Sequence, residues 1–415
     1  MKQLFVHCTR EYTQLALVED GRLAEISIEK TGSDSLVGNI YKGRVVNVLP
    51  GMQAAFVDIG LSKNAFLYVD DCLHPHLEKQ PKVKPSIAEL LSPGDELIVQ
   101  IMKDPLGGKG ARVTTHYSLP GRWLVYMPHA DYVGISKKIE AEDERSRLRQ
   151  LADELRHPGE GLIMRTNAAG MSREALHEDL ESLRLKWREV CVRAEKAAAP
   201  AELHRDSGLV ERMVRDVVTP DTEELIIDDE KRLEEVKAAL RRVVPGMEER
   251  VRLHRDARDM FQAYGIQEQM ERAFQGYIRL ENGGYLVWDQ TEALTVIDVN
   301  TGKYTGTVDL EETVFQTNLK AAEEIARLLR LRDVGGIIIV DFIDMEKEEH
   351  RQQVVERLEA TLKRDRTKCQ VVGWTRLGLL EMTRKKARES VSSYFLKACP
   401  TCKGRGQLFV RGFSV

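Results

Sequence analysis

Two segments of the chain, 294-LTVIDVNTG-302 and 335-GGIIIVDFIDME-346, each run from an apolar strand into acidic residues. The stretch between them, 311-EETVFQTNLKAAEEIARLLRLRD-333, has the apolar spacing of a helix. A strand, a helix and a second strand form a crossover that places the two strands in parallel. Asp298 and Asp341 should then meet at the carboxyl edge of one sheet, where open α/β folds bind their ligands. The sequence therefore predicts an α/β domain with a site at this edge.

The two aspartates predict a metal site. Neighbouring carboxylates repel each other unless a cation lies between them, and oxygen ligands favour Mg²⁺ or Mn²⁺. Asn300 adds a side-chain amide two residues after Asp298. The alternative is that such strand-end residues only cap turns. Asp344 and Glu346 are less convincing candidates for this site, because acidic residues are favoured where a helix begins. The pattern thus favours a metal-assisted phosphoryl reaction.

Composition limits the classes of protein to consider. A chain of 415 residues has room for several domains. It carries 62 basic and 66 acidic residues, so nucleic-acid binding would depend on local basic patches. Because no apolar run reaches the length of a membrane helix, we expect no membrane segment and no signal peptide. The six cysteines are scattered apart from the last two, which is typical of reduced thiols in the cytoplasm.

Residues 38–104 have the pattern of a small β-barrel of the OB type, with short β-rich runs separated by glycines. Phe56 and Phe66 lie on neighbouring predicted strands, and Lys109 lies in a glycine loop close by. Such barrels bind single strands by stacking bases on aromatic rings and attracting phosphates with cations. The alternative is that both phenylalanines belong to the barrel core. Other basic residues in this region are Lys42, Arg44, Lys63 and Arg112.

Two further segments carry basic residues. Arg165 and Thr166 follow an apolar strand and precede Asn-Ala-Ala-Gly, where a guanidinium and a hydroxyl can bind a phosphate; the alternative is a surface arginine. The second segment, 376-RLGLLEMTRKKAR-388, opens residues 376–397, for which we expect a basic helix or a loop followed by a helix. It is either a solvated face or a patch that binds a nucleic-acid backbone. Its basic residues are Arg376, Arg384, Lys385, Lys386 and Arg388.

The pair Cys399-Pro-Thr-Cys402 indicates half of a zinc site. Zinc takes four ligands in a tetrahedron, and the other cysteines lack a matching spacing. The pair follows a helical pattern and precedes a glycine-rich tail, so a redox role is disfavoured. The site is completed most simply if two chains each supply two thiolates. The alternative is a pair of free surface thiols.

Taken together, these segments resemble the ribonuclease E/G family, most closely its ribonuclease G-like members. The matching stretches are GNIYKGRV, QAAFVDIG, NAFL, MRT, TVIDVNTG, ETVFQTNLKAAEEIARLLRLRDVGGIIIVDFIDM, RLGLLEMTRK and CPTCKGRG. They follow the family order from near residue 38 onward, and the block around Asp298 is the longest and most specific. Members of this type usually continue past the zinc motif, whereas here about nine residues follow Gly406. Assembly beyond a dimer is therefore left open.

The resemblance implies a multidomain α/β architecture. A split RNase H-like fold would comprise residues 1–35 and 212–275. An S-one-type OB domain (36–116) and a 5′-sensor domain (117–211) would be inserted in it. A DNase I-like catalytic domain (276–397) and a zinc link with the C-terminal tail (398–415) would follow.

The resemblance also implies roles for individual residues. Asp298 and Asp341 match the Mg²⁺-binding aspartates, and Asn300 matches the asparagine that supports them. The other matches are Phe56, Phe66 and Lys109 for RNA, Arg165 and Thr166 for a 5′-monophosphate, and Cys399 and Cys402 for a zinc shared in a homodimer.

The implied function is that of a cytoplasmic Mg²⁺-dependent endoribonuclease. It would cut single-stranded RNA, with stimulation by a 5′-monophosphate, in ribosomal RNA processing and mRNA turnover. One alternative is a non-catalytic OB-fold RNA-binding protein on a nuclease scaffold, against which the complete set of Asp298, Asn300 and Asp341 argues. Another is a metal-dependent DNase or small phosphodiesterase, which would need neither an OB barrel nor a 5′ sensor.

Overall fold

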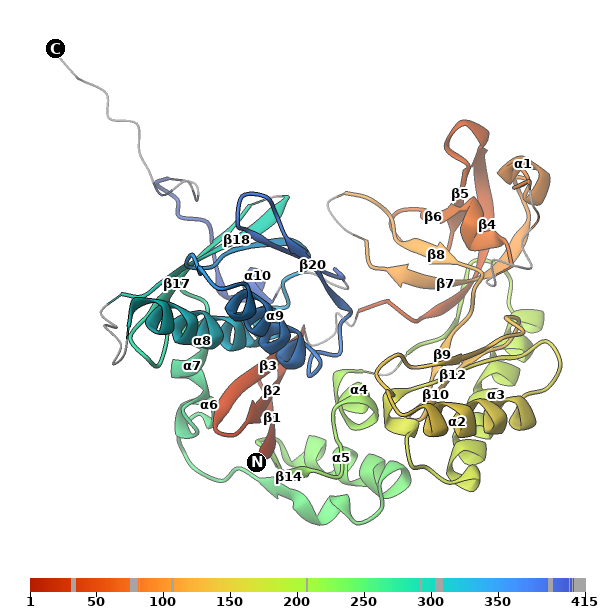
Figure 1. Ribbon diagram of the computed structural model, residues 1–415. Coiled ribbons are helices and arrows are strands. Elements are labelled where there is room, and N and C mark those ends of the chain that lie inside the picture. Colours follow the sequence, from red (N-terminus) through yellow and green to blue (C-terminus); the bar gives the residue numbers. More distant parts are fainter. Residues whose placement is uncertain are drawn as a thin grey trace. The chain divides into compact units, whose positions relative to one another are not determined.

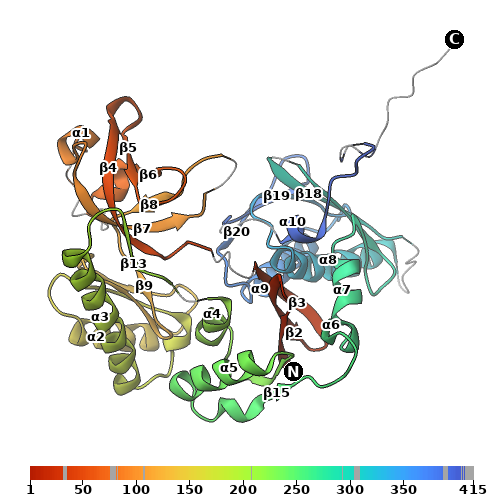
Figure 2. The same ribbon diagram turned by 180° about the vertical axis from the view of Figure 1, so that it is seen from behind.

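The computed structural model describes residues 1–30, 35–74, 81, 83–105, 108–206, 208–291, 293–302, 309–386, 391–402, 404 and 406. The chain divides into two compact units, which can be followed in Figures 1 and 2 by the colours of their segments. The first unit comprises residues 1–30, 219–237 and 247–415, and the second comprises residues 31–218 and 238–246.

One sheet of the first unit joins the beginning of the chain to residues 222–253. Its order is β15-β14-β1-β2-β3, in which β14 runs parallel to both β1 and β15. Asp20 and Gly21 have φ values of 50° and 77° between β2 and β3, as a tight hairpin turn requires. The strands are β1 (Lys2–Cys8), β2 (Tyr12–Glu19), β3 (Arg22–Lys30), β14 (Thr222–Ile227) and β15 (Val251–Leu253).

Short helices continue this part of the chain. They are α5 (Glu230–Val243), η5 (Met247–Arg250), α6 (Met260–Ala263) and α7 (Ile266–Ala273). Asp259 caps α6 by accepting a hydrogen bond from the Gln262 N–H.

The second sheet of this unit contains the two segments that run from an apolar strand into acidic residues, 294–302 and 335–346. Its order is β16-β17-β18-β19-β21-β20, and β18 and β19 are its parallel pair. The strands are β16 (Tyr277–Arg279), β17 (Tyr285–Gln290), β18 (Leu294–Asn300), β19 (Gly336–Asp341), β20 (Cys369–Trp374) and β21 (Leu380–Arg384). Helix α8 (Leu310–Leu331) is the crossover from β18 to β19, so the predicted strand-helix-strand unit is confirmed. The remaining helices are α9 (Glu348–Leu362) and α10 (Ser392–Phe395).

Helix α8 packs against both sheets of the first unit. Its apolar residues share one core with Ile297 and Val340 from the second sheet and with Phe5 from the first. The side chain of Arg330 on α8 is buried and binds Glu19 and Glu25, with N–O distances of 3.0 and 3.2 Å. Strands β18 and β19 therefore rest on a helix whose other side is held by the N-terminal strands. Figure 1 draws α8 in teal above the red strands β1–β3.

The second unit contains a closed five-stranded barrel. Its strands pair in the order β4-β5-β6-β8-β7, and β7 returns to pair with β4. This is the order of an OB-type barrel, which confirms the prediction. The strands are β4 (Ile40–Leu49), β5 (Ala54–Asp58), β6 (Ala65–Tyr68), β7 (Glu96–Lys103) and β8 (Arg112–Thr114). The associated elements are η1 (Pro50–Met52), η2 (Val69–Cys72), α1 (Ile87–Leu90) and β13 (Ala201–His204), which extends β4.

A small four-stranded sheet with the order β11-β12-β10-β9 follows the barrel. The strands are β9 (Leu119–Pro120), β10 (Leu124–Met127), β11 (Val133–Ile135) and β12 (Gly161–Met164). The helices are α2 (Glu142–Leu155), η4 (Thr166–Ala168), α3 (Arg173–Lys196) and α4 (Leu209–Asp216). Ser172 caps α3 by accepting a hydrogen bond from the Ala175 N–H.

Among the described helices of either unit, none is both long enough and apolar enough to cross a membrane.

Candidate active site

Asp298 and Asp341 are direct register partners on the adjacent parallel strands β18 and β19. Neighbouring strands lie about 4.8 Å apart, so the two carboxylates project side by side. Ile297 and Val340 alternate with them and are buried on the opposite face. Both aspartates are exposed. Asp298 and Asp341 therefore lie side by side at one edge of the sheet, as predicted.

Asn300 supports the first of these aspartates. Its side-chain Nδ2 donates a hydrogen bond of 2.8 Å to Oδ2 of Asp298. The two side chains share a face because they are two residues apart on one strand. The bond fixes one carboxylate oxygen and leaves the other oxygen for a second partner.

Asp344, which the sequence left as a less convincing candidate, adds a third carboxylate to the site of Asp298 and Asp341. Helix α9 begins only at Glu348, and its N-cap is Lys347, so Asp344 does not cap it. Desolvation by neighbouring groups, followed by the charges of Asp298 and Asp344, raises the pKa of Asp341 above its ordinary value. Asp344 therefore belongs to the electrostatic environment of the site.

The loop after β19 is held in place by two side chains of α8. Asn318 is 0% exposed, and its amide donates to the Ile343 carbonyl at 2.8 Å and accepts from the Ile343 N–H at 3.1 Å. Glu311 accepts hydrogen bonds from the backbone N–H groups of Glu346 and Lys347 at 3.1 and 3.3 Å. These bonds, the Glu346 N–H foremost, lower the pKa of Glu311 against the opposing effect of desolvation. Asp344 is thus held in a loop that is fixed at both ends.

The donor set suits a magnesium ion that retains water. No group of three or more His, Cys, Asp or Glu side chains in the described parts of the chain is arranged to hold a metal ion. Mg²⁺ is usually bound through one or two carboxylates and keeps several waters. Desolvation raises the pKa of Asp341 most, and repulsion by Asp298 and Asp344 adds to it; a divalent cation between the carboxylates would relieve that repulsion. Asp298 and Asp341 therefore fit Mg²⁺ better than a metal that needs a complete protein cage.

The structure brings Phe56 and Phe66 together on the barrel. They are cross-strand partners on β5 and β6, with ring centroids 6.0 Å apart and planes inclined by 71°. Both side chains are half-buried and neither belongs to the barrel core. This favours contact with a ligand at the barrel surface over the alternative that both phenylalanines are core residues. Lys109 is exposed in the loop before β8. Gly110 follows it because a Cβ there would lie 2.0 Å from the Asn64 carbonyl oxygen.

Several of the basic residues near this barrel face have acidic partners. Arg44 and Lys42 bind Glu96 at 2.8 and 3.1 Å, and Arg112 binds Asp71 at 2.8 Å. Their charges are therefore largely compensated within the barrel, whereas the side chain of Lys109 is exposed.

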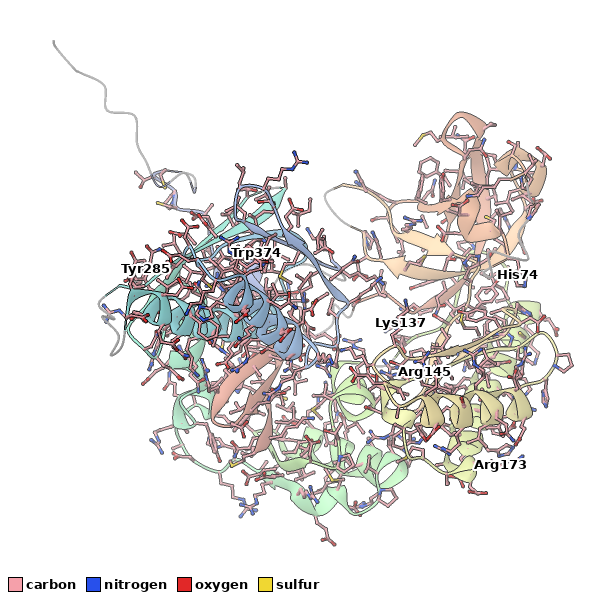
Figure 3. The ribbon with its side chains drawn as sticks, in the orientation of Figure 1. His74, Lys137, Arg145, Arg173, Tyr285 and Trp374 are labelled. Atoms are coloured by element: carbon pink, nitrogen blue, oxygen red, sulfur yellow. The ribbon has the colours of Figure 1, made fainter. Side chains whose placement is uncertain are left out.

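Arg165 and Thr166 lie at the end of β12 in the second unit. One guanidinium nitrogen of Arg165 donates to the Gly121 carbonyl at 2.5 Å, and another lies 2.7 Å from Asp216. Thr166 Oγ1 lies 2.9 Å from Ser136 Oγ. The guanidinium is thus fixed by neighbours that the sequence pattern did not reveal. Figure 3 labels Lys137, the exposed residue that follows Ser136.

Cys399 and Cys402 lie close together after α10. The Cys399 thiol is exposed, and hydrogen bonds from the Cys402 and Thr401 N–H groups and from the Cys402 side chain lower its pKa to about 7. Thiolate is the form that binds zinc. Zinc requires four ligands, and this pair has the chemistry to be two of them.

The helix or loop-helix predicted for residues 376–397 is wrong for residues 380–384, which form strand β21. Arg384 is 4% exposed and binds Asp365 and Asp333, each at 2.7 Å. It is therefore part of the protein interior and not of a backbone-binding patch. Arg376, Lys385 and Lys386 are exposed. Arg388 lies outside the described residues.

Comparisons with known proteins identify the family of this chain. Residues 118–387 match the model of the ribonuclease E/G family. The chain is 44% identical to ribonuclease G of Haemophilus influenzae over 412 residues, which is 98% of this chain and 84% of that protein. It is 43% identical to ribonuclease G of Escherichia coli K12 over 411 residues, or 97% and 84% of the two proteins. It is 41% identical to ribonuclease E of the same strain, over 98% of this chain and 39% of that enzyme. The chain therefore belongs to the ribonuclease E/G family.

Proposed function

We propose that the protein is an endoribonuclease that hydrolyses phosphodiester bonds of single-stranded RNA with Mg²⁺. The observation that carries the proposal is the register pairing of Asp298 with Asp341 on two parallel strands. Membership of the ribonuclease E/G family supports the reaction class.

The geometry of the site supports the catalytic roles that we propose. Asp298 and Asp341 would hold Mg²⁺, and Asn300 would orient Asp298 through its 2.8 Å hydrogen bond. When held there, Mg²⁺ would supply Lewis-acid polarisation of the scissile phosphate and would make a bound water more acidic. Hydrolysis by water needs no covalent intermediate and no attack by the 2′-hydroxyl. The products would be a 5′-phosphate and a 3′-hydroxyl.

The second unit would position the substrate. The half-buried pair of Phe56 and Phe66 can stack on bases, and the exposed Lys109 can contact the backbone. Positioning of this kind is a large part of catalysis by such enzymes. Arg165 and Thr166 would bind a 5′-monophosphate and make cleavage sensitive to that group. Asp216 and the Gly121 carbonyl fix the orientation of the Arg165 guanidinium before a phosphate binds.

The finer architecture is also part of the proposal. We assign residues 1–35 and 212–275 to an RNase H-like domain and residues 276–397 to a DNase I-like domain. Cys399 and Cys402 would share Zn²⁺ with the same pair of a second copy. We further assign the enzyme to ribosomal RNA processing and mRNA turnover in the cytoplasm.

The test is cleavage of a short 5′-monophosphorylated single-stranded RNA with Mg²⁺, comparing wild type with Asp298→Asn and Asp341→Asn. Each substitution removes a metal ligand and should slow cleavage by at least about 100-fold, while RNA binding is retained. Asp289→Asn is the control, because Asp289 is also exposed but lies on β17 and pairs with Val296. Binding without cleavage by wild type would favour a non-catalytic RNA-binding protein. Near-normal cleavage by Asp298→Asn would exclude this metal site.

A further inference from the structure

The face of the second sheet that carries the catalytic carboxylates continues past them onto β17. Tyr285 is the cross-strand partner of Asn300, and Val287 is the partner of Asp298. Directly opposed residues in an antiparallel pair project from the same face. Leu286, between the two, is 0% exposed and projects into the core. Tyr285 therefore lies on the same face as Asp298, one strand away.

Strand β16 extends this face by one more aromatic ring. Tyr277 is the partner of Val287, and Arg279 is the partner of Tyr285, while Ile278 between them is buried. The rings of Tyr277 and Tyr285 are stacked, with centroids 4.5 Å apart and planes inclined by 27°. We call these two residues the tyrosine platform. Figure 3 labels Tyr285 on its strand.

The tyrosine platform does not contribute to the core of the unit. Tyr277 is 48% exposed, and neither tyrosine belongs to the buried cluster beneath the sheet. A large aromatic ring that remains half in water still has favourable free energy to gain by stacking. Such rings are typical of surfaces that bind nucleobases.

The platform is tied closely to the strand that bears the catalytic residues. Gly302 follows Asn300 with a φ of 59°, and a Cβ there would lie 2.6 Å from the Gly283 carbonyl oxygen and 3.2 Å from Cδ1 of Tyr285. Only glycine lets the backbone after Asn300 pass this close to the ring. The position of Tyr285 is therefore set by the same backbone that sets Asn300.

Arg279 gives the platform a cation. It is exposed on β16 and, among the described residues, it makes no ion pair or side-chain hydrogen bond. As the partner of Tyr285, it lies on the same face as both rings. Stacking rings beside a cation form the usual combination for binding single strands, because the rings take bases and the cation takes a phosphate.

We propose that the tyrosine platform stacks on one nucleobase of the RNA strand that crosses Asp298 and Asp341, and that Arg279 contacts a phosphate of the same strand. The inference rests on the proposed nuclease function and adds a binding subsite within the catalytic sheet itself. Because every base has a ring face, the contact tolerates any base. It fixes the strand on the side of β18 away from β19.

The test measures RNA affinity in an Asp298→Asn background, so that the substrate stays intact. Tyr277→Leu should weaken binding by about 5- to 150-fold, the range for losing one base-stacking contact. Tyr277→Phe should bind like the parent, because stacking needs the ring and not the hydroxyl. Tyr264→Leu is the matched control, since Tyr264 is 45% exposed in the same unit but lies after α6 and off this sheet. Thermal unfolding verifies that each variant is folded.

A set of RNAs with one abasic nucleotide at successive positions identifies the base concerned. In the parent, one position near the cut should weaken binding, and that penalty should vanish in Tyr277→Leu because the two changes remove the same contact. Arg279→Gln gives an independent measurement and should reduce the salt dependence of binding by about one phosphate contact. The proposal is overturned if the abasic penalties are the same in both proteins or if Tyr277→Phe binds as weakly as Tyr277→Leu. Mg²⁺-dependent cleavage by wild type is measured separately, so a failure of this subsite is distinct from a failure of the nuclease function.

Discussion

Replacing Arg384 by methionine should destabilise the protein without changing the salt dependence of RNA binding. The guanidinium is 4% exposed and binds Asp365 and Asp333 at 2.7 Å each, and it also donates to the Val334 carbonyl at 2.9 Å. Removing one partner of a buried ion pair leaves an uncompensated charge and costs about 3–5 kcal/mol. A domain of this size class loses about 2–4 °C per kcal/mol. We therefore expect the unfolding temperature to fall by about 6–20 °C.

The assay pairs thermal unfolding with the salt dependence of RNA binding. Arg384→Met should leave the salt slope unchanged, and adding Asp365→Asn should recover part of the lost stability, because it removes one of the two carboxylate charges that Arg384 neutralises. Lys385→Gln is the matched control, since Lys385 is the exposed neighbour. Its unfolding temperature should stay at the wild-type value. A smaller salt slope for Arg384→Met with no loss of stability would refute the structural role of Arg384. A double variant less stable than Arg384→Met would refute the unpaired charge as the cause.

Three further predictions concern other parts of the chain. His7 pairs with Asp228, and this hydrogen bond raises the pKa of His7 above its ordinary 6.5 against the opposing effect of burial. Its stabilisation should be complete below about pH 6.5 and disappear as the pH rises through the higher folded-state pKa. Unfolding curves of His7→Asn should lack this dependence, and profiles parallel to wild type would contradict it. Removing zinc with a chelator, or replacing Cys399 and Cys402 by alanine, should give monomers in light scattering, and a persistent dimer would argue for another interface. Arg165→Gln should abolish a rate preference of about tenfold or more for 5′-monophosphate over 5′-hydroxyl RNA; an unchanged ratio would mean that the phosphate binds elsewhere.

Local patterns in the sequence were sufficient for the strands that carry Asp298 and Asp341. Each strand is a short apolar run that ends in polar residues, and the helix between them has a clear helical period. The handedness of such crossovers then places both strand ends at one edge. The barrel followed from the same kind of local signal, since its glycines and β-branched residues mark its turns and strands.

The errors arose where a pattern had two interpretations or where the contact was distant in sequence. In β21, Leu380, Met382 and Arg384 alternate inward at a period of two, but the dense charge that follows suggested a helix. The role of Asp344 depends on how Asn318 holds the loop after β19, and no local pattern encodes that contact. The register between paired strands is likewise not encoded by a local sequence pattern.

The stacking of Tyr277 on Tyr285 depends on the pairing of β16 with β17, which composition does not reveal. The ion pair of Arg165 with Asp216 likewise joins residues from separate elements. Such contacts become visible only when the strands and helices have been assembled, so tertiary structure was needed to find them.

The double attachment of α8 bears on how this enzyme could be divided or recombined. A fragment of residues 276–397 contains every carboxylate of the proposed metal site. It lacks Glu19 and Glu25, which bind the buried Arg330, and it lacks the Leu23 carbonyl, to which Arg327 donates. Such a fragment would expose one whole side of the helix on which the active-site loop is anchored. The smallest fragment that keeps this active site intact therefore includes the first thirty residues of the chain, although none of them is proposed to bind the metal or the RNA.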